Sequence, residues 1–173
     1  MGVIRGPDGE AVELLARTLI GRSPACDVVL EDRSVSGEHA VLAWVDGDGW
    51  VLRDLGSRNG TTLDGRPVHG AIGVSVGARI GFGEVRWAVE EAAAPAPRAV
   101  ALEDGQVVIA DGDLLGLPDP AAPEVTVIRT ADGWIAEDDA GPRPVTDRST
   151  IAVRGRRWEL RLPVVLASTV ARG

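Results

Sequence analysis

The sequence predicts an all-β protein: a β-sandwich followed by a second, smaller β-rich domain. Short apolar runs recur between turn signals along most of the 173 residues, and helical periodicity is almost absent. The chain contains 22 Gly and 11 Pro, so frequent turns and short elements are expected. Many short strands at close spacing favour a sandwich over other folds.

In the first half, the apolar runs are the segments expected to form strands. A Gly-Asp-Gly sequence at residues 47–49 separates two of them in the way that a hairpin turn does. The expected strands lie at residues 14–20, 28–30, 40–45, 50–52, 72–76, 78–82 and 85–89.

Composition changes after this first β-rich stretch. Residues 92–98 read Ala-Ala-Ala-Pro-Ala-Pro-Arg, which is typical of a semi-extended linker. We therefore expect a first domain at residues 1–91, a linker at 92–98 and a second β-rich unit at 99–163. The final residues, 164–173, show no clear element and are interpreted as a tail. Strands in the second unit are expected at residues 107–110, 125–128, 134–136, 150–153 and 158–162.

The two halves share short sequences. Asp-Gly-Trp-Val at residues 48–51 matches Asp-Gly-Trp-Ile at 132–135, and a Gly-x-x-Arg-Trp pattern at 83–87 is echoed by Gly-Arg-Arg-Trp at 155–158. Two interpretations remain open. The second unit is a degenerate copy of the first, or two β domains share common turn and strand chemistry.

Charge and composition exclude several classes of function. The net charge is −8, all 18 basic residues are arginine, and no basic run occurs, which argues against direct binding to nucleic acid or to an anionic membrane. The single cysteine, Cys26, permits no internal disulfide. The first residues lack an apolar signal core and no stretch is long enough to span a bilayer, so a cytoplasmic location is expected. The Ala-, Gly- and Arg-rich composition without lysine is typical of a GC-rich bacterium.

Three polar stretches between expected strands stand out. They are Gly-Arg-Ser at residues 21–23, Ser-Gly-Glu-His at 36–39 and Asp-Leu-Gly-Ser-Arg-Asn-Gly-Thr at 54–61. In this order and spacing they resemble the forkhead-associated (FHA) family, which shows Gly-Arg, Ser-x-x-His and Ser-x-Asn-Gly-Thr loops. Asp64-Gly65 fits the turn that follows in the family, and the resemblance covers about residues 10–90. It implies an FHA-type β-sandwich that binds threonine-phosphorylated proteins or peptides.

The chemistry of these residues agrees with that implication. A phosphothreonine carries nearly two negative charges and three strong acceptor oxygens. The Arg22 guanidinium can donate two parallel hydrogen bonds to a phosphate, and the Ser36 hydroxyl supplies a compact neutral donor. Arg58 adds positive charge, and the Asn59 amide suits the main chain of an extended peptide. We therefore predict a phosphopeptide-binding site at Arg22, Ser36, Gly37, Arg58 and Asn59.

A second group of residues is expected to support this site. By resemblance, His39 holds the loop architecture through hydrogen bonds and does not touch phosphate. Gly56 and Gly60 are expected at positive φ, and Gly21 is expected to allow close backbone packing beside Arg22.

Two positions depart from the family pattern. Gly37 stands where members often place Asn, Arg or Lys, so a phosphate donor is missing. Arg58 stands where many members have Thr, and its charge offsets the loss at Gly37. We expect these two departures to change the affinity for the phosphopeptide and the peptide sequence that is preferred.

The leading hypothesis is therefore a signalling adaptor that acts downstream of a Ser/Thr kinase, and the alternative is a structural or regulatory scaffold with a vestigial phosphate pocket. The second unit has neither Ser-x-x-His nor Asn-Gly. Gly-Pro-Arg-Pro at residues 141–144 occupies the place where the Asn-Gly loop is expected.

No enzyme, metal or cofactor is predicted. Ser36, His39 and Asp54 lack the Gly-x-Ser-x-Gly context of a hydrolase. Cys26, His39 and His69 match no zinc spacing, and no nucleotide-binding glycine pattern occurs.

Overall fold

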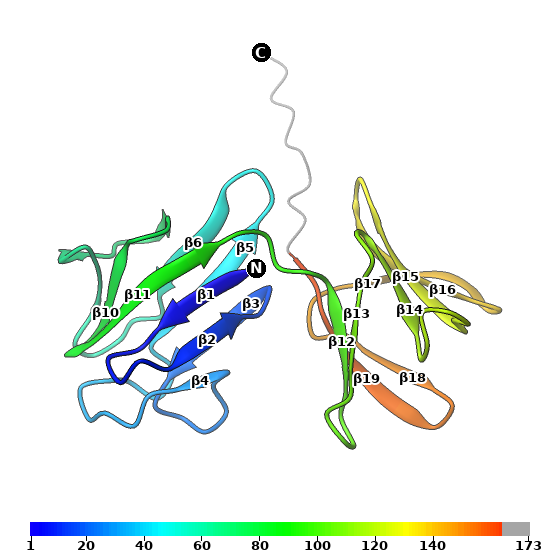
Figure 1. The fold of residues 1–173 in the computed structure, drawn as a ribbon, viewed down its shortest axis with the longest axis horizontal. Coiled ribbons are helices and arrows are strands. Elements are labelled where there is room, and N and C mark those ends of the chain that lie inside the picture. The colour runs from blue at the N-terminus through cyan, green and yellow to red at the C-terminus, as the bar shows by residue number, and fades with distance from the viewer. Residues whose placement is uncertain (164–173) are drawn as a thin grey trace, which may run out of the picture. The chain divides into compact units, whose positions relative to one another are not determined.

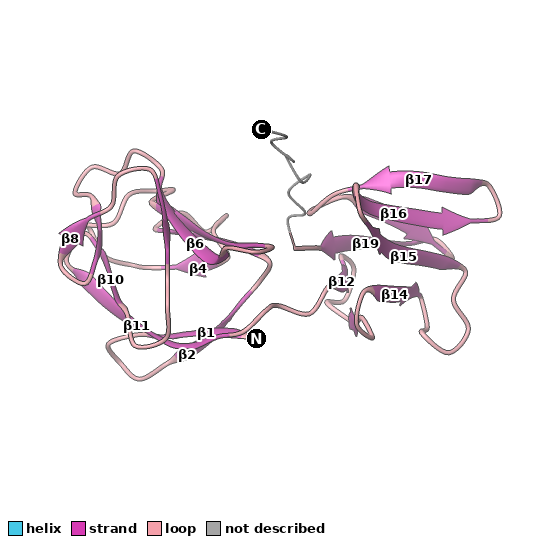
Figure 2. Cartoon of the chain, turned by 90° about the horizontal axis from the view of Figure 1, so that it is seen from above, coloured by secondary structure: helices cyan, strands magenta, loops and turns pink. Residues whose placement is uncertain are grey.

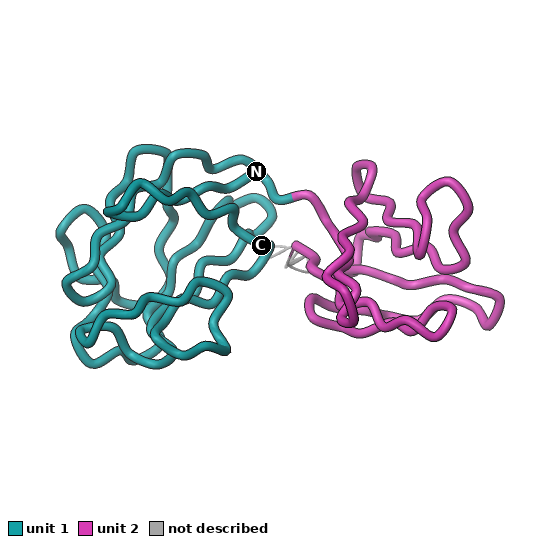
Figure 3. Tube along the Cα trace, turned by 60° about the horizontal axis from the view of Figure 1, so that its bottom comes forward, with its two compact units in different colours: residues 1–95 teal, residues 96–173 magenta. Residues whose placement is uncertain are grey.

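The computed structural model describes residues 1–163, which form strands and turns (Figures 1 and 2). The chain divides into two compact units, Met1–Pro95 and Ala96–Gly173 (Figure 3). Within residues 1–163, no helix is long and apolar enough to cross a membrane. The expectation for the tail at 164–173 lies outside the described residues.

Unit 1 consists of two sheets. One has the order β2-β1-β11-β10-β7-β8, and the other has the order β4-β3-β5-β6-β9. All pairings are antiparallel except the parallel pair β3 and β4. The strands are Gly2–Arg5 (β1), Ala11–Leu14 (β2), Arg17–Gly21 (β3), Val28–Val29 (β4), Ala40–Val45 (β5), Gly49–Asp54 (β6), Thr61–Leu63 (β7), Arg66–Pro67 (β8), Ala71–Gly73 (β9), Arg79–Phe82 (β10) and Val85–Ala92 (β11).

The core of unit 1 follows from the period of two along its strands. In β6 the side chains of Trp50 and Leu52 are buried, while their neighbours are partly or fully exposed. Successive side chains of a strand point to opposite faces, so one face of each sheet supplies the core. The largest fully buried side chains of this unit are Trp50, Phe82, Ile4, Leu14, Ile20, Leu42, Leu52 and Ile80.

Unit 2 repeats the strand order of unit 1. Its sheets are β13-β12-β19-β18 and β14-β15-β16-β17. In chain order they correspond to β2-β1-β11-β10 and β3-β5-β6-β9; β4, β7 and β8 have no counterpart within residues 96–163. The strands are Arg98–Ala101 (β12), Val107–Ile109 (β13), Leu114–Leu117 (β14), Val125–Thr130 (β15), Gly133–Asp138 (β16), Gly141–Val145 (β17), Thr150–Val153 (β18) and Arg156–Arg161 (β19).

Hydrogen bonds that lie outside the ladders are repeated as well. The indole of Trp50 donates to the carbonyl of Ala93 at 3.1 Å, and the indole of Trp134 donates to the carbonyl of Pro163 at 3.0 Å. Trp50 and Trp134 occupy the same position in β6 and β16, whose burial patterns are identical. Ala93 is the first residue after β11 and Pro163 is the second after β19, so in both units the chain just beyond the last strand is tied to the equivalent tryptophan.

The loop before the penultimate strand gives a second match. Gly77 N–H donates to the Val89 carbonyl, and Arg148 N–H donates to the Leu160 carbonyl, each at 2.8 Å. Gly77 and Arg148 both have positive φ, 86° and 64°. Shared strand order and shared irregular bonds favour the interpretation that unit 2 is a second sandwich of the same topology.

Strands β1, β7, β8, β12 and β14 were not expected from the sequence, and three further details differ from the prediction. The run at 14–20 is interrupted, because β2 ends at Leu14 and β3 begins at Arg17. The residues between β11 and β12 that lie outside strands are 93–97. Residues 141–144 were expected in a loop but belong to β17, an edge strand; there the prolines need no N–H for a ladder, which is where sheets tolerate proline.

Candidate functional site

Three loops of unit 1 carry all of the predicted site residues except Gly21, which is the last residue of β3. They leave β3, β4 and β6 at residues 22–27, 30–39 and 55–60. The parallel pairing of Ile20 with Val28 and of Gly21 with Val29 brings the ends of β3 and β4 together. The antiparallel pairing of Ala40 with Asp54 does the same for β5 and β6. The sheet therefore gathers these loops before any side chain contributes.

Backbone contacts join the first two loops. Arg22 N–H donates to the Ser36 carbonyl at 2.8 Å, and Ser23 N–H donates to the Gly37 carbonyl at 2.9 Å. A Cβ atom on Gly21 would lie 2.2 Å from the Gly37 carbonyl oxygen, so only glycine fits at this crossing. The Arg22 Nε donates to the Val35 carbonyl at 3.2 Å, which leaves the two terminal nitrogens of the guanidinium as donors.

The Ser36 side chain connects the second loop to the third. Its hydroxyl oxygen accepts the backbone N–H of Arg58 at 2.9 Å. Because that bond uses a lone pair of the oxygen, the hydroxyl proton remains a donor. Arg22, Ser36 and Arg58 are therefore consecutive members of one hydrogen-bonded chain across three loops.

His39 is completely buried beneath these loops. Its Nδ1 accepts the Ser36 backbone N–H at 3.0 Å, and its Nε2 lies 3.1 Å from the Gly60 carbonyl. Since Nδ1 accepts, the neutral ring carries its proton on Nε2 and donates it to Gly60. The ring also packs edge-on against Phe82, with centroids 5.8 Å apart. His39 thus fixes the spacing between Ser36 and Gly60 and contacts no solvent.

Asp54 organises the third loop. Its carboxylate accepts the backbone N–H groups of Gly56 and Ser57, both at 2.9 Å, and the hydroxyls of Ser57 and Thr61 at 2.6 and 2.5 Å. Burial by itself raises the pKa of Asp54, but these four hydrogen bonds stabilise the charged form and outweigh it, so the pKa lies below its usual value. The ionised carboxylate is therefore part of the loop structure.

Asn59 is exposed, and its Nδ2 donates to the Ser34 carbonyl at 2.8 Å. Ser34 is itself held by Asp32, which accepts its N–H at 2.7 Å and its hydroxyl at 2.5 Å, while the Ser34 hydroxyl accepts the N–H of Glu84 at 2.9 Å. The Asn59 side-chain carbonyl remains an acceptor at the surface. Asn59 thus lies on the same connected set of loops.

The other predicted residues occupy open positions. Gly37 is exposed, and a Cβ atom there would meet nothing within 4 Å. Gly56 and Gly60 have φ of 77° and 76°, in the left-handed region that disfavours side chains. The Arg58 side chain is exposed and forms no ion pair with any residue in 1–163.

The sequence analysis missed the supporting role of four residues. They are Asp32, Ser34, Asp54 and Thr61, and they hold the second and third loops through side-chain hydrogen bonds. The signal was present in the sequence, because Asp followed two or three residues later by Ser is typical of turns in which the carboxylate accepts backbone N–H groups. Within the described residues no group of acidic, Cys and His side chains could hold a metal ion.

The corresponding end of unit 2 is built differently. Residues 118–124 join β14 to β15, and residues 139–140 join β16 to β17, so both connections are shorter than their counterparts. Glu124, Asp138 and Asp139 line this end, where Arg154 pairs with Glu124 and Arg143 pairs with Asp138. Its charged groups are therefore mostly acidic, and its arginines are neutralised.

Unit 1 is thus a sandwich that presents three mutually bonded polar loops at one end, the design of a binding module whose scaffold pre-organises its site. Residues 18–83 match the family model of the FHA domain. This match confirms the resemblance of the first half of the chain to FHA domains and the all-β fold class inferred from the sequence.

The chain is similar to several known proteins in this region. It is 42% identical over 66 residues to the FHA domain-containing protein FhaB of Mycolicibacterium smegmatis, covering 38% of this chain and 42% of FhaB. It is 38% identical over 86 residues to the oxoglutarate dehydrogenase inhibitor of Corynebacterium diphtheriae, covering 49% of this chain and 59% of the inhibitor. The match thus spans about half the length of these relatives.

A solved structure supports the fold. The FHA domain of the CT664 protein of Chlamydia trachomatis superposes with a TM-score of 0.50 at 23% identity, over 53% of this chain and 98% of that chain. The chain is also 30% identical to an FHA domain solved in a study of phosphothreonine-dependent FHA domain interactions, over 54% of this chain and all of that chain, with a TM-score of 0.49.

Proposed function

We propose that unit 1 binds threonine-phosphorylated segments of partner proteins, with the phosphate held between Arg22 and Ser36. The observation that carries this proposal is the hydrogen bond from Arg58 N–H to the Ser36 hydroxyl oxygen. It fixes the serine and leaves its proton to donate beside two exposed arginines, Arg22 and Arg58. A hydroxyl and guanidinium groups are the donors that suit a phosphate with about two negative charges.

Local charge makes this site plausible on an acidic chain. The net charge is −8, so the whole-molecule field repels an anion and attraction must come from nearby groups. Arg22 and Arg58 flank Ser36 through direct backbone hydrogen bonds, and Asn59 follows Arg58 in the same loop. We assign Asn59 to the main chain of the bound segment and Gly37 to an open contact surface beside the phosphate.

The test is a titration of the full chain with phosphothreonine peptides of varied sequence and with their phosphoserine and unphosphorylated counterparts. We expect binding that requires phosphate and that falls roughly tenfold to a hundredfold in Arg22→Gln and in Ser36→Ala, because each removes a charge-assisted hydrogen bond. Arg66→Gln is the matched control, since Arg66 is exposed in β8 and lies outside the three loops. Equal affinity for phosphorylated and unphosphorylated peptides would refute the proposal.

At the level of the cell, we propose that the chain is a cytoplasmic adaptor without enzymatic activity, and that it acts downstream of a Ser/Thr kinase. The relatives support a binding role because the matched region is an FHA domain. The adaptor role predicts that affinity capture of partners from cells depends on kinase activity and on Ser36.

A second function is favoured by Gly37, which removes a donor beside the phosphate. In that case unit 1 is a scaffold whose phosphate pocket is vestigial. Partner capture would then be unchanged by Arg22→Gln and by phosphatase treatment, so the same experiment separates the two functions.

A further inference from the structure

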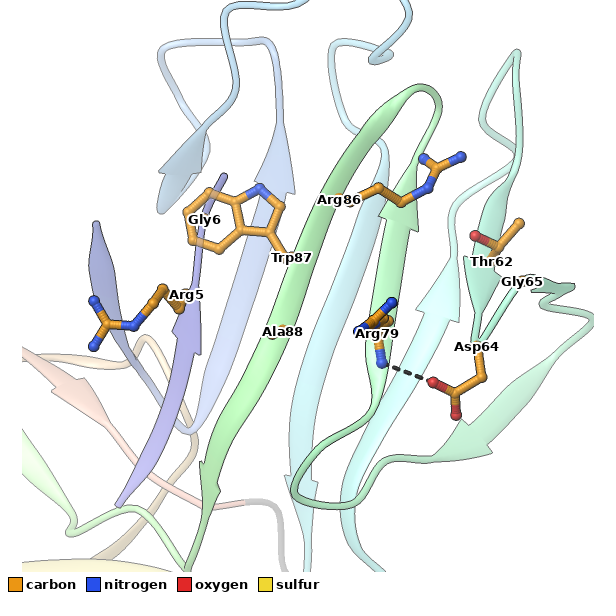
Figure 4. A pocket seen from close by; sticks show the side chains of 9 residues that line it. All are labelled: Arg5, Gly6, Thr62, Asp64, Gly65, Arg79, Arg86, Trp87 and Ala88. Carbon is orange, nitrogen blue, oxygen red and sulfur yellow. Dashed lines mark hydrogen bonds between the residues drawn. The ribbon is translucent and has the colours of Figure 1, made fainter. Parts of the chain in front are cut away.

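A cavity of about 630 Å³ lies on the outer face of the sheet that contains β1, β7, β10 and β11 (Figure 4). It is separate from the loop site, and it contains none of the predicted phosphopeptide residues. Its lining residues are Arg5, Gly6, Thr62, Asp64, Gly65, Arg79, Arg86, Trp87 and Ala88. Three of these are arginine and only one, Asp64, is acidic, so the lining carries net positive charge on an otherwise acidic protein.

The three arginines differ in whether an acidic side chain already pairs with them. Arg5 forms a two-point ion pair with Glu90, and its guanidinium points away from Arg79 and Arg86 in Figure 4. Arg79 and Arg86 form no ion pair with any other residue described in the structure. The Asp64 carboxylate accepts the backbone N–H of Arg79 at 2.8 Å, so part of its capacity as an acceptor is already used. Two guanidinium groups therefore remain available to an incoming anion.

The absence of a side chain at Gly81 lets two donors lie directly over its backbone. A Cβ atom on Gly81 would lie 2.3 Å from the Thr62 Oγ1 and 2.9 Å from the Arg86 Nη1. The hydroxyl and the guanidinium thus converge over a residue that has no side chain. Arg86 Nη1 donates to the carbonyls of Gly83 at 2.7 Å and Val85 at 3.1 Å, which anchors the side chain and leaves Nε and Nη2 as donors.

In unit 2 the position equivalent to Gly81 carries a side chain. Gly81 pairs with Arg86 across β10 and β11, and Ala152 pairs with Arg157 across β18 and β19. Ala152 supplies the Cβ that Gly81 lacks, and the Nε of Arg157 donates to Glu103 at 3.2 Å. The equivalent arginine of unit 2, Arg157, is therefore already paired with Glu103. The residue opposite it, Ala152, has a Cβ atom where unit 1 has none.

We propose that this cavity of unit 1 is a second anion-binding site, which holds one carboxylate or phosphate monoester of a partner protein between Arg86, Arg79 and the Thr62 hydroxyl. The Arg86 guanidinium and the Thr62 hydroxyl meet over the bare backbone of Gly81, and the Arg79 guanidinium lines the same cavity. Neither arginine has an acidic partner among the described residues, so these donors suit an anion. The site does not involve Arg22 or Ser36, so it stands independently of the phosphothreonine proposal.

The site lies close to the third loop of unit 1. Gly83 N–H donates to the Gly60 carbonyl at 3.1 Å, and Thr62 is two residues further along β7. With about 3.3 Å per residue in a strand, Thr62 lies about 7 Å beyond Gly60 along the chain. The cavity therefore borders the end of the third loop.

The test is an NMR titration of the full chain carrying Ser36→Ala, which weakens the loop site. The probes are inorganic phosphate and, separately, acetate. We expect dose-dependent shifts at the Gly81 and Thr62 amides and at the Arg86 Nε–H, with affinity at least about tenfold lower in Arg86→Gln. Arg53→Gln is the control, because Arg53 is exposed in β6 of the other sheet and should leave the titration unchanged.

The outcomes separate the sources of the anion. Shifts with both probes indicate a carboxylate or a phosphate, and shifts with phosphate alone indicate a phosphorylated residue. Gly81→Ala gives a second variant, since its Cβ would displace the Thr62 hydroxyl and the Arg86 guanidinium while every charge is retained, and it should weaken both titrations. The absence of shifts at these three groups, or equal titrations in Arg86→Gln, would overturn the proposal. Shifts confined to residues 21–23, 36–39 and 54–61 would assign the anion to the loop site and would overturn it equally.

Discussion

Unit 1 and unit 2 share a strand order and differ at the end where unit 1 carries its loops. Residues 22–39 and 55–70 connect the strands of unit 1, whereas residues 118–124 and 139–140 make the equivalent connections in unit 2. The difference shows that the sandwich is a scaffold and that the candidate site belongs to the insertions between its strands. Unit 2 keeps the strand order with shorter connections, and it lacks the groups that suit phosphate.

The last residue of the second hairpin strand illustrates this point. Asp54 ends β6 and Asp138 ends β16. Asp54 holds a long loop through Gly56, Ser57 and Thr61, whereas Asp138 accepts the N–H of Ala140 and pairs with Arg143 at 2.6 Å. Both carboxyl groups have a lowered pKa, Asp54 because its hydrogen bonds outweigh burial and Asp138 chiefly because of its bond to Arg143. The same position thus orders a binding loop in one unit and closes a tight turn in the other.

The largest expected effect concerns the equivalent tryptophans. Trp50→Ala and Trp134→Ala should each lower the free energy of unfolding of their own unit by about 3–5 kcal/mol, because each removes a large buried side chain and one hydrogen bond. Only Trp50→Ala should also abolish phosphopeptide binding. Denaturant unfolding followed by unit-specific NMR signals, together with a peptide titration, measures both. Loss of binding in Trp134→Ala would contradict the assignment of the site to unit 1.

The next effect concerns the buried histidine His39, which has no counterpart in unit 2. His39→Ala leaves the part-buried Ser36 N–H and Gly60 carbonyl without their partner, at a cost of up to about 1–3 kcal/mol for each group. We expect lower stability of unit 1 and weaker phosphopeptide binding, measured by thermal unfolding and isothermal titration calorimetry. His69→Ala is the control, since His69 is exposed, and it should change neither quantity.

A pH titration tests the role of Asp54. Its folded-state pKa lies below that of the unfolded chain, so its contribution to stability is complete above the unfolded value of about 4 and is lost as the pH falls through the folded value. Unit 1 should therefore lose stability in this acid window, and Asp54→Asn should flatten that part of the profile. Peptide affinity should begin to fall earlier, below about pH 6, where phosphothreonine gains its proton. An unchanged acid profile in Asp54→Asn would refute the role of this carboxylate.

A smaller effect is a gain of affinity at Gly37. Gly37→Lys adds a donor at an open position, where no atom lies within 4 Å of the new Cβ, and it should strengthen phosphopeptide binding by roughly threefold to tenfold. Gly21→Ala is the contrasting variant, because its Cβ would meet the Gly37 carbonyl oxygen at 2.2 Å and should destabilise the loops. Weaker binding in Gly37→Lys would show that this side of the loop does not face the phosphate.

The smallest effect concerns the exposed pair Arg157 and Glu103 in unit 2. Glu103→Gln removes a surface ion pair, and the loss of such a pair changes the stability of a protein little because water screens it. Stability should hardly change, and Arg157 should still fail to bind phosphate because Ala152 fills the space beside it. An NMR titration with inorganic phosphate measures this, and a site as strong as that proposed at Arg86 would show that the bare backbone of Gly81 is not needed.

The sequence by itself determined the all-β class and the resemblance of residues 10–90 to FHA domains. Strand periodicity depends on neighbours in the chain, and the Gly-Arg, Ser-x-x-His and Ser-x-Asn-Gly-Thr loops are local patterns, so both are readable without coordinates. The assignment of Arg22, Ser36 and Asn59 to phosphopeptide binding stays a prediction for the variants above.

Only the tertiary structure decided which groups meet. The bond from Arg58 N–H to the Ser36 hydroxyl and the bridge of His39 to Gly60 join residues that are distant in the chain. The same is true of the Thr62 hydroxyl, which lies over Gly81. The proline-bearing segment Gly141–Val145 likewise forms strand β17, because an edge strand does not need an N–H donor from each of its residues. Such contacts arise from strand pairing and packing. A sequence pattern predicts that strands form, but it does not say which strands pair or which side chains meet.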